Sequence, residues 1–129
     1  MTIPNNKFKH LTILIVEDDE DSYFLITILF RNLKPILIHS RNGEEAVEMC
    51  KTNRDIDIVL MDLNLPLLNG FEATRKIRQF RPELPIIAQT AYTMGDEMNE
   101  CFEAGCNDYI TKPINKNELF HKLDKYVNK

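Results

Sequence analysis

The chain has 129 residues, of which 43% are hydrophobic and 28% are charged, proportions that fit one folded domain rather than a disordered segment. Its net charge of −4 argues against binding to nucleic acid, which requires a basic face. No run approaches the ~20 apolar residues of a membrane span, so we expect no membrane partner. The three cysteines, Cys50, Cys101 and Cys106, form no CxxC pair and indicate free thiols in a reducing cytoplasm.

Along the chain, short apolar runs alternate five times with longer segments whose apolar residues have helical spacing. Residues 1–10 are polar and are expected to form a loosely held tail ahead of a domain that covers residues 11–129. The expected strands are Leu11–Val16, Ile36–His39, Ile56–Asp62, Leu84–Thr90 and Asp108–Thr111. The expected helices are Asp21–Leu33, Gly43–Asn53, Phe71–Phe80, Met94–Ala104 and Lys116–Val127.

Local signals support these boundaries. Asn42 is a good N-cap for the second helix, and Gly105 suits the left-handed position after the fourth. In the first helix, core spacing directs Leu25, Ile26, Leu29 and Leu33 inward, and Pro35 prevents its continuation. Five strand–helix alternations predict a doubly wound α/β fold, with a five-stranded parallel sheet in the flavodoxin-like order 2-1-3-4-5.

Chemically useful side chains stand at the carboxyl ends of the expected strands, the edge where such sheets bind ligands. Asp18 and Asp19 follow the first strand, and Asp62 ends the third. Three carboxylates this close together need a cation or raised pKa values. A hard divalent ion such as Mg²⁺, which keeps several waters and binds phosphoryl oxygens, suits a site of this kind.

The fourth and fifth strands supply the groups that a phosphoryl group needs. Thr90 offers a hydroxyl donor and Lys112 offers a positive point charge. A carboxylate can act as a nucleophile and form an aspartyl phosphate. Asp62 is the best candidate for this nucleophile, because it is central in the sheet and an open loop follows it.

The sequence resembles a response-regulator receiver domain of two-component signalling, and within that family it is most similar to the receivers attached to hybrid histidine kinases. The motifs that carry this resemblance are Val16-Glu17-Asp18-Asp19, Met61-Asp62-Leu63-Asn64-Leu65-Pro66, Asn69-Gly70-Phe71-Glu72-Ala73-Thr74, Thr90-Ala91 and Ala104-Gly105-Cys106-Asn107-Asp108-Tyr109-Ile110-Thr111-Lys112-Pro113. It implies a phosphorelay component that receives a phosphoryl group on Asp62 from a histidine kinase or a histidine phosphotransfer domain. Such a domain is a signalling acceptor that acts on an effector. It is not an enzyme, although it assists its own phosphorylation and dephosphorylation.

The resemblance also assigns roles to individual residues. It implies that Asp19 and Asp62 ligate Mg²⁺ together with the backbone carbonyl of Asn64, and that Asp18 acts mainly through bound water. It implies that Lys112 contacts the phosphate and that the Lys112–Pro113 peptide bond is cis. Thr90 and Tyr109 would form the switch pair, which changes conformation when Asp62 is phosphorylated.

Two further surfaces follow from the residues themselves. The first helix is apolar nearly all round. Turning Leu25 and Leu29 inward leaves an outward side made of Phe24, Thr27 and Arg31, flanked by Tyr23 and Phe30. Tyr23, Phe24 and Thr27 of this side, together with Pro113, are our candidates for docking the donor's helices. Asn64 and Tyr92, each two residues past a site residue, are candidates to govern the approach of hydrolytic water.

Three other types of protein fit this sequence less well. A flavodoxin-type protein would need a phosphate loop where this chain has four acidic residues, and a haloacid-dehalogenase phosphatase would carry its nucleophile after the first strand. A receiver-like docking module that works without phosphorylation would be expected to lack one of the key groups, and none is missing from this sequence.

Overall fold

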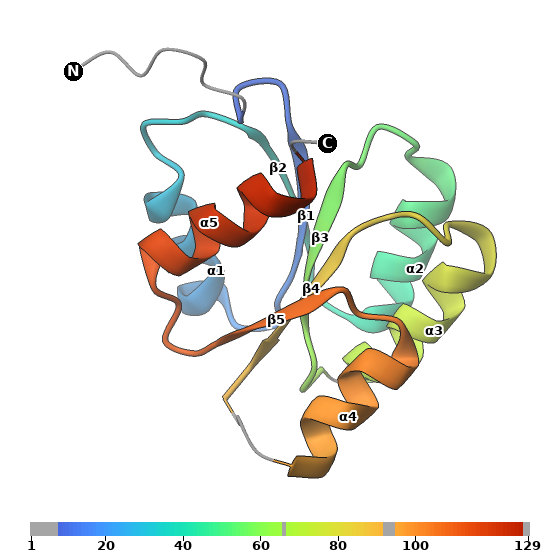
Figure 1. The fold of residues 1–129 in the computed structure, drawn as a ribbon. Helices are drawn as coiled ribbons and strands as arrows, with labels where there is room; N and C mark the ends of the chain where they lie inside the picture. The colour runs from blue at the N-terminus through green and yellow to red at the C-terminus, as the bar shows by residue number, and fades with distance from the viewer. Residues whose placement is uncertain (1–7, 66, 92–94, 128–129) are drawn as a thin grey trace.

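The computed structural model describes residues 8–65, 67–91 and 95–127, and these form a doubly wound α/β domain (Figure 1). The strands are β1 (Thr12–Val16), β2 (Ile36–Ser40), β3 (Ile58–Asp62), β4 (Ile86–Thr90) and β5 (Asp108–Thr111). The helices are α1 (Glu20–Leu29), α2 (Gly43–Thr52), α3 (Gly70–Phe80), α4 (Gly95–Ala104) and α5 (Lys116–Val127). Every expected element is present.

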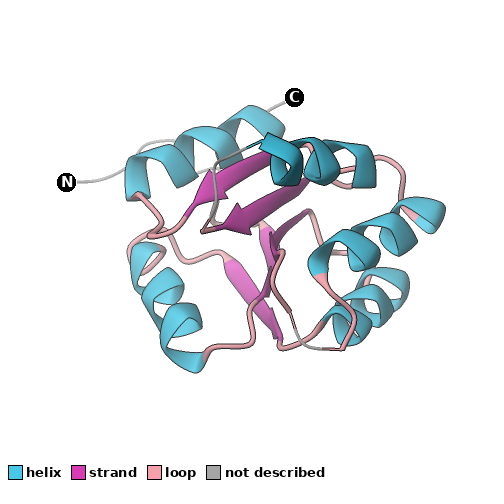
Figure 2. Ribbon diagram, turned by 90° about the horizontal axis from the view of Figure 1, so that it is seen from below, coloured by secondary structure: helices cyan, strands magenta, loops and turns pink. Residues whose placement is uncertain are grey.

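The strands form one parallel sheet in the order β2-β1-β3-β4-β5, which confirms the predicted fold. Helices α1 and α5 cover one face, and α2, α3 and α4 cover the other (Figures 1 and 2). Because all five strands run in the same direction, their carboxyl ends meet at one edge of the sheet.

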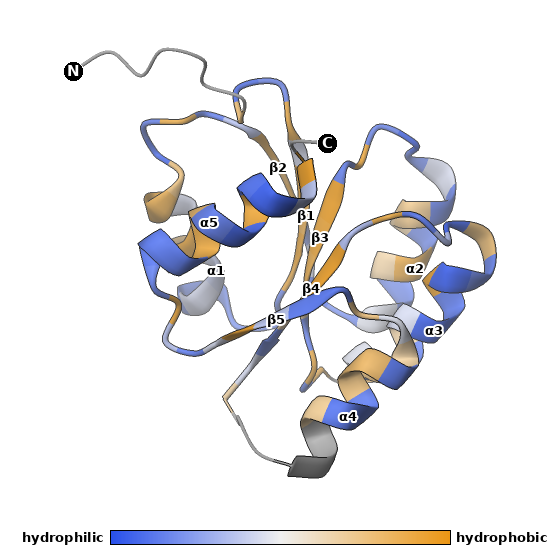
Figure 3. Cartoon of the chain, viewed as in Figure 1, coloured by the Kyte–Doolittle hydropathy of each residue, from blue (hydrophilic) through white to orange (hydrophobic). Residues whose placement is uncertain are grey.

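The core explains why the strand sequences are continuous apolar runs. Every residue of β1, β3 and β4 is buried. Figure 3 shows β3 at the centre of the molecule coloured mostly as hydrophobic. One cluster of buried side chains packs under α2, α3 and α4, and a second packs under α1 and α5. Among the described residues, no helix has the length and apolar character needed to cross a membrane.

Four of the described helices begin at side-chain caps. The capping residues each accept a hydrogen bond from the backbone N–H three residues later, at 2.8–3.0 Å, and they are Asp19, Asn42, Asn69 and Asn115. This arrangement satisfies one of the N–H groups that a helix start leaves unpaired. The cap predicted at Asn42 is confirmed.

Helix α1 differs from the prediction in both length and orientation. It ends at Leu29 because the next residues form tight turns, in which the N–H groups of Leu33 and Lys34 both donate to the Phe30 carbonyl. The inward stripe is Ile26, Phe30 and Leu33, whereas Leu25 is 63% exposed. Ile26 and Leu33 are thus buried as predicted, but the inward placement of Leu25 and the outward placement of Phe30 were wrong. Spacing alone cannot orient a helix that is apolar nearly all round.

The N-terminal segment is less detached than expected. Phe8 is only 8% exposed and packs against Phe120 of α5, with ring centroids 5.7 Å apart. The backbone N–H of Leu11 also donates to the Phe8 carbonyl. The expected tail thus contributes a core side chain at residue 8, two residues before its predicted end.

Candidate functional site

A cleft of about 470 Å³ opens at the carboxyl edge of the sheet. It is lined by the β1–α1 turn, the β3–α3 loop, and the ends of β4 and β5. This is the edge at which the sequence placed its candidate residues, and Asp62, Thr90 and Lys112 all line the cleft.

Three carboxylates converge in the cleft, namely those of Glu17, Asp18 and Asp62. One oxygen from each lies within 4.8 Å of the others. Glu17 and Asp62 are almost fully buried, at 1% and 3% exposed, and Asp18 is exposed. Burial, and then the neighbouring Asp62 charge, raise the pKa of Glu17 to about 7. Glu17 was not among the predicted site residues.

Lys112 is the positive group of the cluster. Its Nζ donates to Asp62 Oδ2 at 3.1 Å and to Glu17 Oε1 at 3.2 Å. Burial lowers the pKa of Lys112, but the Asp62 and Glu17 carboxylates raise it by more, so it lies above its usual value. The Lys112–Pro113 bond that brings this side chain back to the site is cis, as predicted.

The β3–α3 loop fixes the second oxygen of Asp62. The Asn64 backbone N–H donates to Asp62 Oδ1 at 3.0 Å. The loop closes at Gly70, where a Cβ would lie 2.3 Å from the Asp62 carbonyl oxygen and 2.7 Å from the Leu63 Cα. Only glycine permits this approach, so α3 begins directly against the backbone of the central acid.

Asp19 does not belong to the carboxylate cluster, contrary to our expectation of a metal ligand. Its carboxylate caps α1 and accepts from the Ser22 N–H at 3.0 Å and from the Ser22 hydroxyl at 2.7 Å. These two hydrogen bonds lower the pKa of Asp19. In a run of four acidic residues, the structure turns Glu17 and Asp18 toward Asp62, and Asp19 lines the cleft as a helix cap.

The predicted switch residues lie on adjacent strands. Thr90 is 3% exposed at the end of β4 and lines the cleft. Tyr109 of β5 is half-buried beside Ala88, with the Lys122 Nζ 4.6 Å from its ring centroid and Phe102 of α4 against its edge. Tyr109 therefore stands between the strand that carries Thr90 and the outer surface of α4. Tyr92 lies outside the described residues, so its role stays a prediction.

The predicted docking residues gather along α1 beside the cleft. Phe24 is 63% exposed, Tyr23 stacks on His39 with ring centroids 3.7 Å apart, and the Thr27 hydroxyl donates to the Phe24 carbonyl. Leu25 and Ile28 add exposed apolar surface. Leu25 and Ile28 line a groove of about 340 Å³ that continues to Pro113 and Ile114. Of the predicted docking residues, only Pro113 lines this groove.

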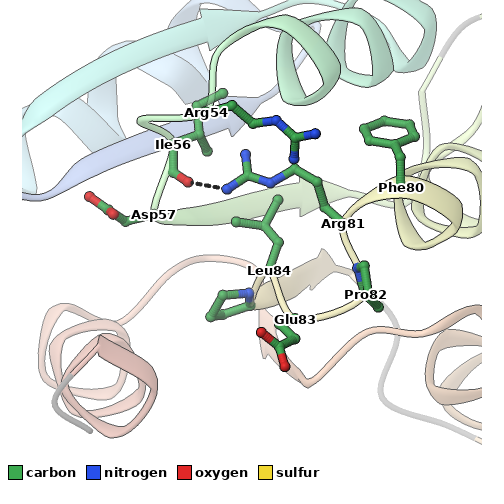
Figure 4. A pocket seen from close by; sticks show the side chains of 9 residues that line it. Arg54, Ile56, Asp57, Phe80, Arg81, Pro82, Glu83 and Leu84 are labelled. Atoms are coloured by element: carbon green, nitrogen blue, oxygen red, sulfur yellow. Dashed lines mark hydrogen bonds between the residues drawn. The ribbon is translucent and has the colours of Figure 1, made fainter.

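A second hollow, of about 410 Å³, lies at the opposite, amino-terminal edge of β3 and β4 (Figure 4). The Arg81 guanidinium there donates to the Ile56 carbonyl at 2.8 Å, and the Asp57 carboxylate accepts from the Thr12 N–H at 2.9 Å. These charged groups hold loops together and do not converge on a common point. The chemistry of the molecule is therefore concentrated in the cleft around Asp62.

The donor set of the cleft fits a hard divalent cation. Its groups are carboxylate oxygens with a backbone carbonyl nearby in the loop, and such oxygen ligands suit Mg²⁺. Among the described residues the cluster contains no thiolate or imidazole, the ligands that would favour zinc. Three carboxylates against one ammonium leave an excess of negative charge that such an ion would neutralise.

Comparison with known proteins gives a consistent result. Residues 13–124 match the family model described as "Response regulator receiver domain". The autoinducer 1 sensor kinase/phosphatase LuxN of Vibrio campbellii is 33% identical over 118 residues, which span 92% of this chain but only 14% of LuxN. The chain thus corresponds in length to a small part of that relative.

Two solved structures are also similar. The receiver domain of sensor histidine kinase PA1611 from Pseudomonas aeruginosa, described with a magnesium ion coordinated in its active site cleft, is 34% identical with a TM-score of 0.86, covering 93% of this chain and 99% of that one. The receiver domain of Ssk1 from Saccharomyces cerevisiae, co-crystallised with the histidine phosphotransfer protein Ypd1, was also found. Its match is 32% identical with a TM-score of 0.83 and covers 92% and 90% of the two chains. By sequence and by fold, this chain belongs to the response regulator receiver domain family.

Proposed function

We propose that this domain is the phosphoacceptor of a two-component phosphorelay, and that Asp62 is the residue that receives the phosphoryl group. The observation that carries the proposal is the position of the Asp62 carboxylate. It lies at the carboxyl end of the central strand, 3.1 Å from the Lys112 ammonium and beside two further carboxylates in an open cleft. This combination supplies a nucleophile, a phosphate-binding charge and oxygen ligands for a cation.

The transfer step needs a phosphohistidine donor. An oxygen of Asp62 attacks the phosphorus, the phosphorus–nitrogen bond breaks, and its electron pair returns to the imidazole of the donor. Lys112 then moves its hydrogen bonds from the carboxylates to a phosphoryl oxygen, and the Thr90 hydroxyl donates to another. Glu17, Asp18, Asp62 and the Asn64 carbonyl would hold Mg²⁺, which supplies charge neutralisation to the phosphoryl oxygens when it is bound.

The output of the domain follows from the position of Thr90. Movement of its hydroxyl toward a phosphoryl oxygen would free space beside β5 and allow Tyr109 to turn inward. A charge-assisted hydrogen bond of about 1.5–3 kcal/mol is enough to shift a two-state equilibrium by roughly 10- to 100-fold. The surface that changes is then the one formed by Phe102 of α4 and Tyr109, which would meet the effector.

The donor docks on α1. The exposed side chains of Phe24, Leu25 and Ile28 and the groove that leads to Pro113 form an apolar surface next to the cleft. Helices of a histidine kinase or a phosphotransfer domain suit such a surface, because an amphipathic helix can lay its apolar side chains into a groove. The receiver of Ssk1, crystallised with Ypd1, is a precedent for this class of partner.

The test is phosphorylation by a small donor. Incubation with acetyl phosphate and Mg²⁺ should give an acid-stable, base-labile acyl phosphate, detected by intact mass, and Asp62→Asn should remove it. Asp55→Asn is the matched control, because Asp55 is an exposed acid that precedes the same strand. Equal labelling of the Asp62→Asn variant would contradict the assignment. A wild-type chain that takes no label would indicate a docking module that works without phosphorylation.

The same proposal extends to the type of activity and to the cellular compartment. The domain acts as a signalling acceptor rather than as an enzyme, and its only catalysis is of its own phosphorylation and dephosphorylation. We place it in the reducing cytoplasm, in keeping with three buried cysteines that form no disulfide.

A further inference from the structure

Gln89 of β4 is a buried polar residue with no apparent structural purpose. Its side chain is 0% exposed, and neither its Oε1 nor its Nε2 has a hydrogen-bond partner among the described residues. Buried amides are nearly always paired, since an unpaired one forfeits its hydrogen bonds to water. An unpaired buried group in a native structure therefore calls for an explanation, such as a role in binding or catalysis.

The register places Gln89 between the two central groups of the site. Its Cα pairs with that of Asp62 on β3, and with that of Ile110 on β5, two residues before Lys112. Side chains alternate along a strand, so residues two apart share a face. Ile87 lies two residues before Gln89, Leu60 lies two residues before Asp62, and both pack under α1 and α5 together with Ile110. Gln89 and Asp62 therefore project from the same face of the sheet.

Lys112 must pass over the end of β4 to reach Asp62, because β4 separates β5 from β3. Gln89 lies along that path and lines the cleft together with Thr90 and Lys112. It also lines the apolar groove beside α1, so its carboxamide is part of the wall between the two hollows.

We propose that Gln89 is a further phosphoryl-binding residue, whose Nε2–H donates to an oxygen of the phosphoryl group on Asp62. This inference rests on the proposed function, because it requires an occupied Asp62. In the unphosphorylated protein the Gln89 amide has no hydrogen-bond partner among the described residues. On phosphorylation it donates to the phosphoryl group alongside Lys112 and Thr90. Gln89 does not contact the carboxylate oxygens that would hold Mg²⁺, so its effect is on the phosphoryl group and not on the cation.

The first measurement uses beryllofluoride, a phosphoryl mimic, in the presence of Mg²⁺. Gln89→Met keeps the length and volume of the side chain and removes both polar atoms. It should weaken beryllofluoride binding by about 10-fold, the loss of one charge-assisted donor, and leave Mg²⁺ affinity unchanged. It should also raise the melting temperature by about 3 °C or more, because an unpaired buried amide has been removed.

Ile87→Met is the matched control, since Ile87 is buried on the same face of the same strand and carries no polar atom. It should leave beryllofluoride affinity unchanged. A second measurement on the wild-type chain does not depend on any variant: the Gln89 side-chain amide signal in a ¹⁵N correlation spectrum should shift on beryllofluoride binding.

The outcomes separate this inference from the proposed function. A wild-type chain that binds no beryllofluoride with Mg²⁺ overturns both. Normal binding by the wild type, with equal binding by Gln89→Met and an unmoved amide signal, overturns the role of Gln89 alone. The same holds if Gln89→Met slows transfer only from a protein donor, because Gln89 would then contact the partner in the α1 groove.

Discussion

Removal of the buried charge of Glu17 should stabilise the cation-free protein. The pKa of Glu17 rises from 4.5 to about 7, and at 1.36 kcal/mol for each pH unit this corresponds to about 3 kcal/mol of unfavourable free energy for the ionised, folded form. In Glu17→Gln the amide oxygen accepts a weaker hydrogen bond from Lys112, which offsets about 1 kcal/mol. The expected gain is about 2 kcal/mol, or about 7 °C in melting temperature for a chain of 129 residues.

The pH dependence gives this prediction its sign. Because the folded pKa of this acid lies above the unfolded one, the destabilisation is absent below about pH 4.5, grows between 4.5 and 7, and is complete above about 7. Urea and thermal unfolding in EDTA at pH 8 and pH 4.5 should therefore show a more stable Glu17→Gln variant only at pH 8. Glu48→Gln, at an exposed acid of α2, should change stability by less than about 0.5 kcal/mol. A variant no more stable than wild type at pH 8 would refute the reasoning.

Three further predictions test the support of the site and its docking surface. Asp19→Ala should lower the melting temperature through loss of the α1 cap and leave Mg²⁺ affinity unchanged in a titration; a large loss of affinity would restore Asp19 as a ligand. Gly70→Ala places a Cβ 2.3 Å from the Asp62 carbonyl oxygen. It should lower the free energy of unfolding by at least about 2 kcal/mol and slow labelling by acetyl phosphate, whereas unchanged stability and labelling would show that the loop can move to accommodate the Cβ. Phe24→Asp should slow transfer from a protein donor but not from acetyl phosphate, with the exposed Lys76→Ala as control; equal slowing with both donors would indicate a defect in the site.

The fold could be predicted because its signals are local. Fully buried parallel strands are continuous apolar runs, and caps such as Asn42 mark helix starts. Helix α1 was the exception. Its apolar residues surround the axis, so the spacing that placed Ile26 correctly in the core could not tell that Phe30 faces the sheet while Leu25 faces outward. Packing against the second core cluster makes that choice, and it is not a property of the helix alone.

The site was predicted to the correct edge of the sheet, with Asp18 and Asp62 in it, but Asp19 was named where the structure places Glu17. Four successive carboxylates after β1 gave the sequence no means to say which would turn toward Asp62. One signal was available: Asp19 precedes the helix and Ser22 follows it by three residues, the spacing of a cap. With Asp19 assigned to the cap, Glu17 and Asp18 are the acids left to face the site. Gln89 gave no such signal, because whether a buried amide finds a partner depends on neighbouring strands.

The charge balance of the cleft connects these observations. Burial of Glu17 opposes its ionisation, and Lys112 cannot neutralise Glu17, Asp18 and Asp62 alone. A bound divalent cation relieves this repulsion, so cation binding and folding stability are linked, and binding should release a proton from Glu17 near neutral pH. Mg²⁺ should therefore raise the melting temperature of the wild type more than that of Glu17→Gln, as followed by thermal unfolding at increasing Mg²⁺. Neutralisation of the cluster by the cation also weakens the attraction of the carboxylates for the Lys112 ammonium. Lys112 can then move its hydrogen bonds to the phosphoryl group.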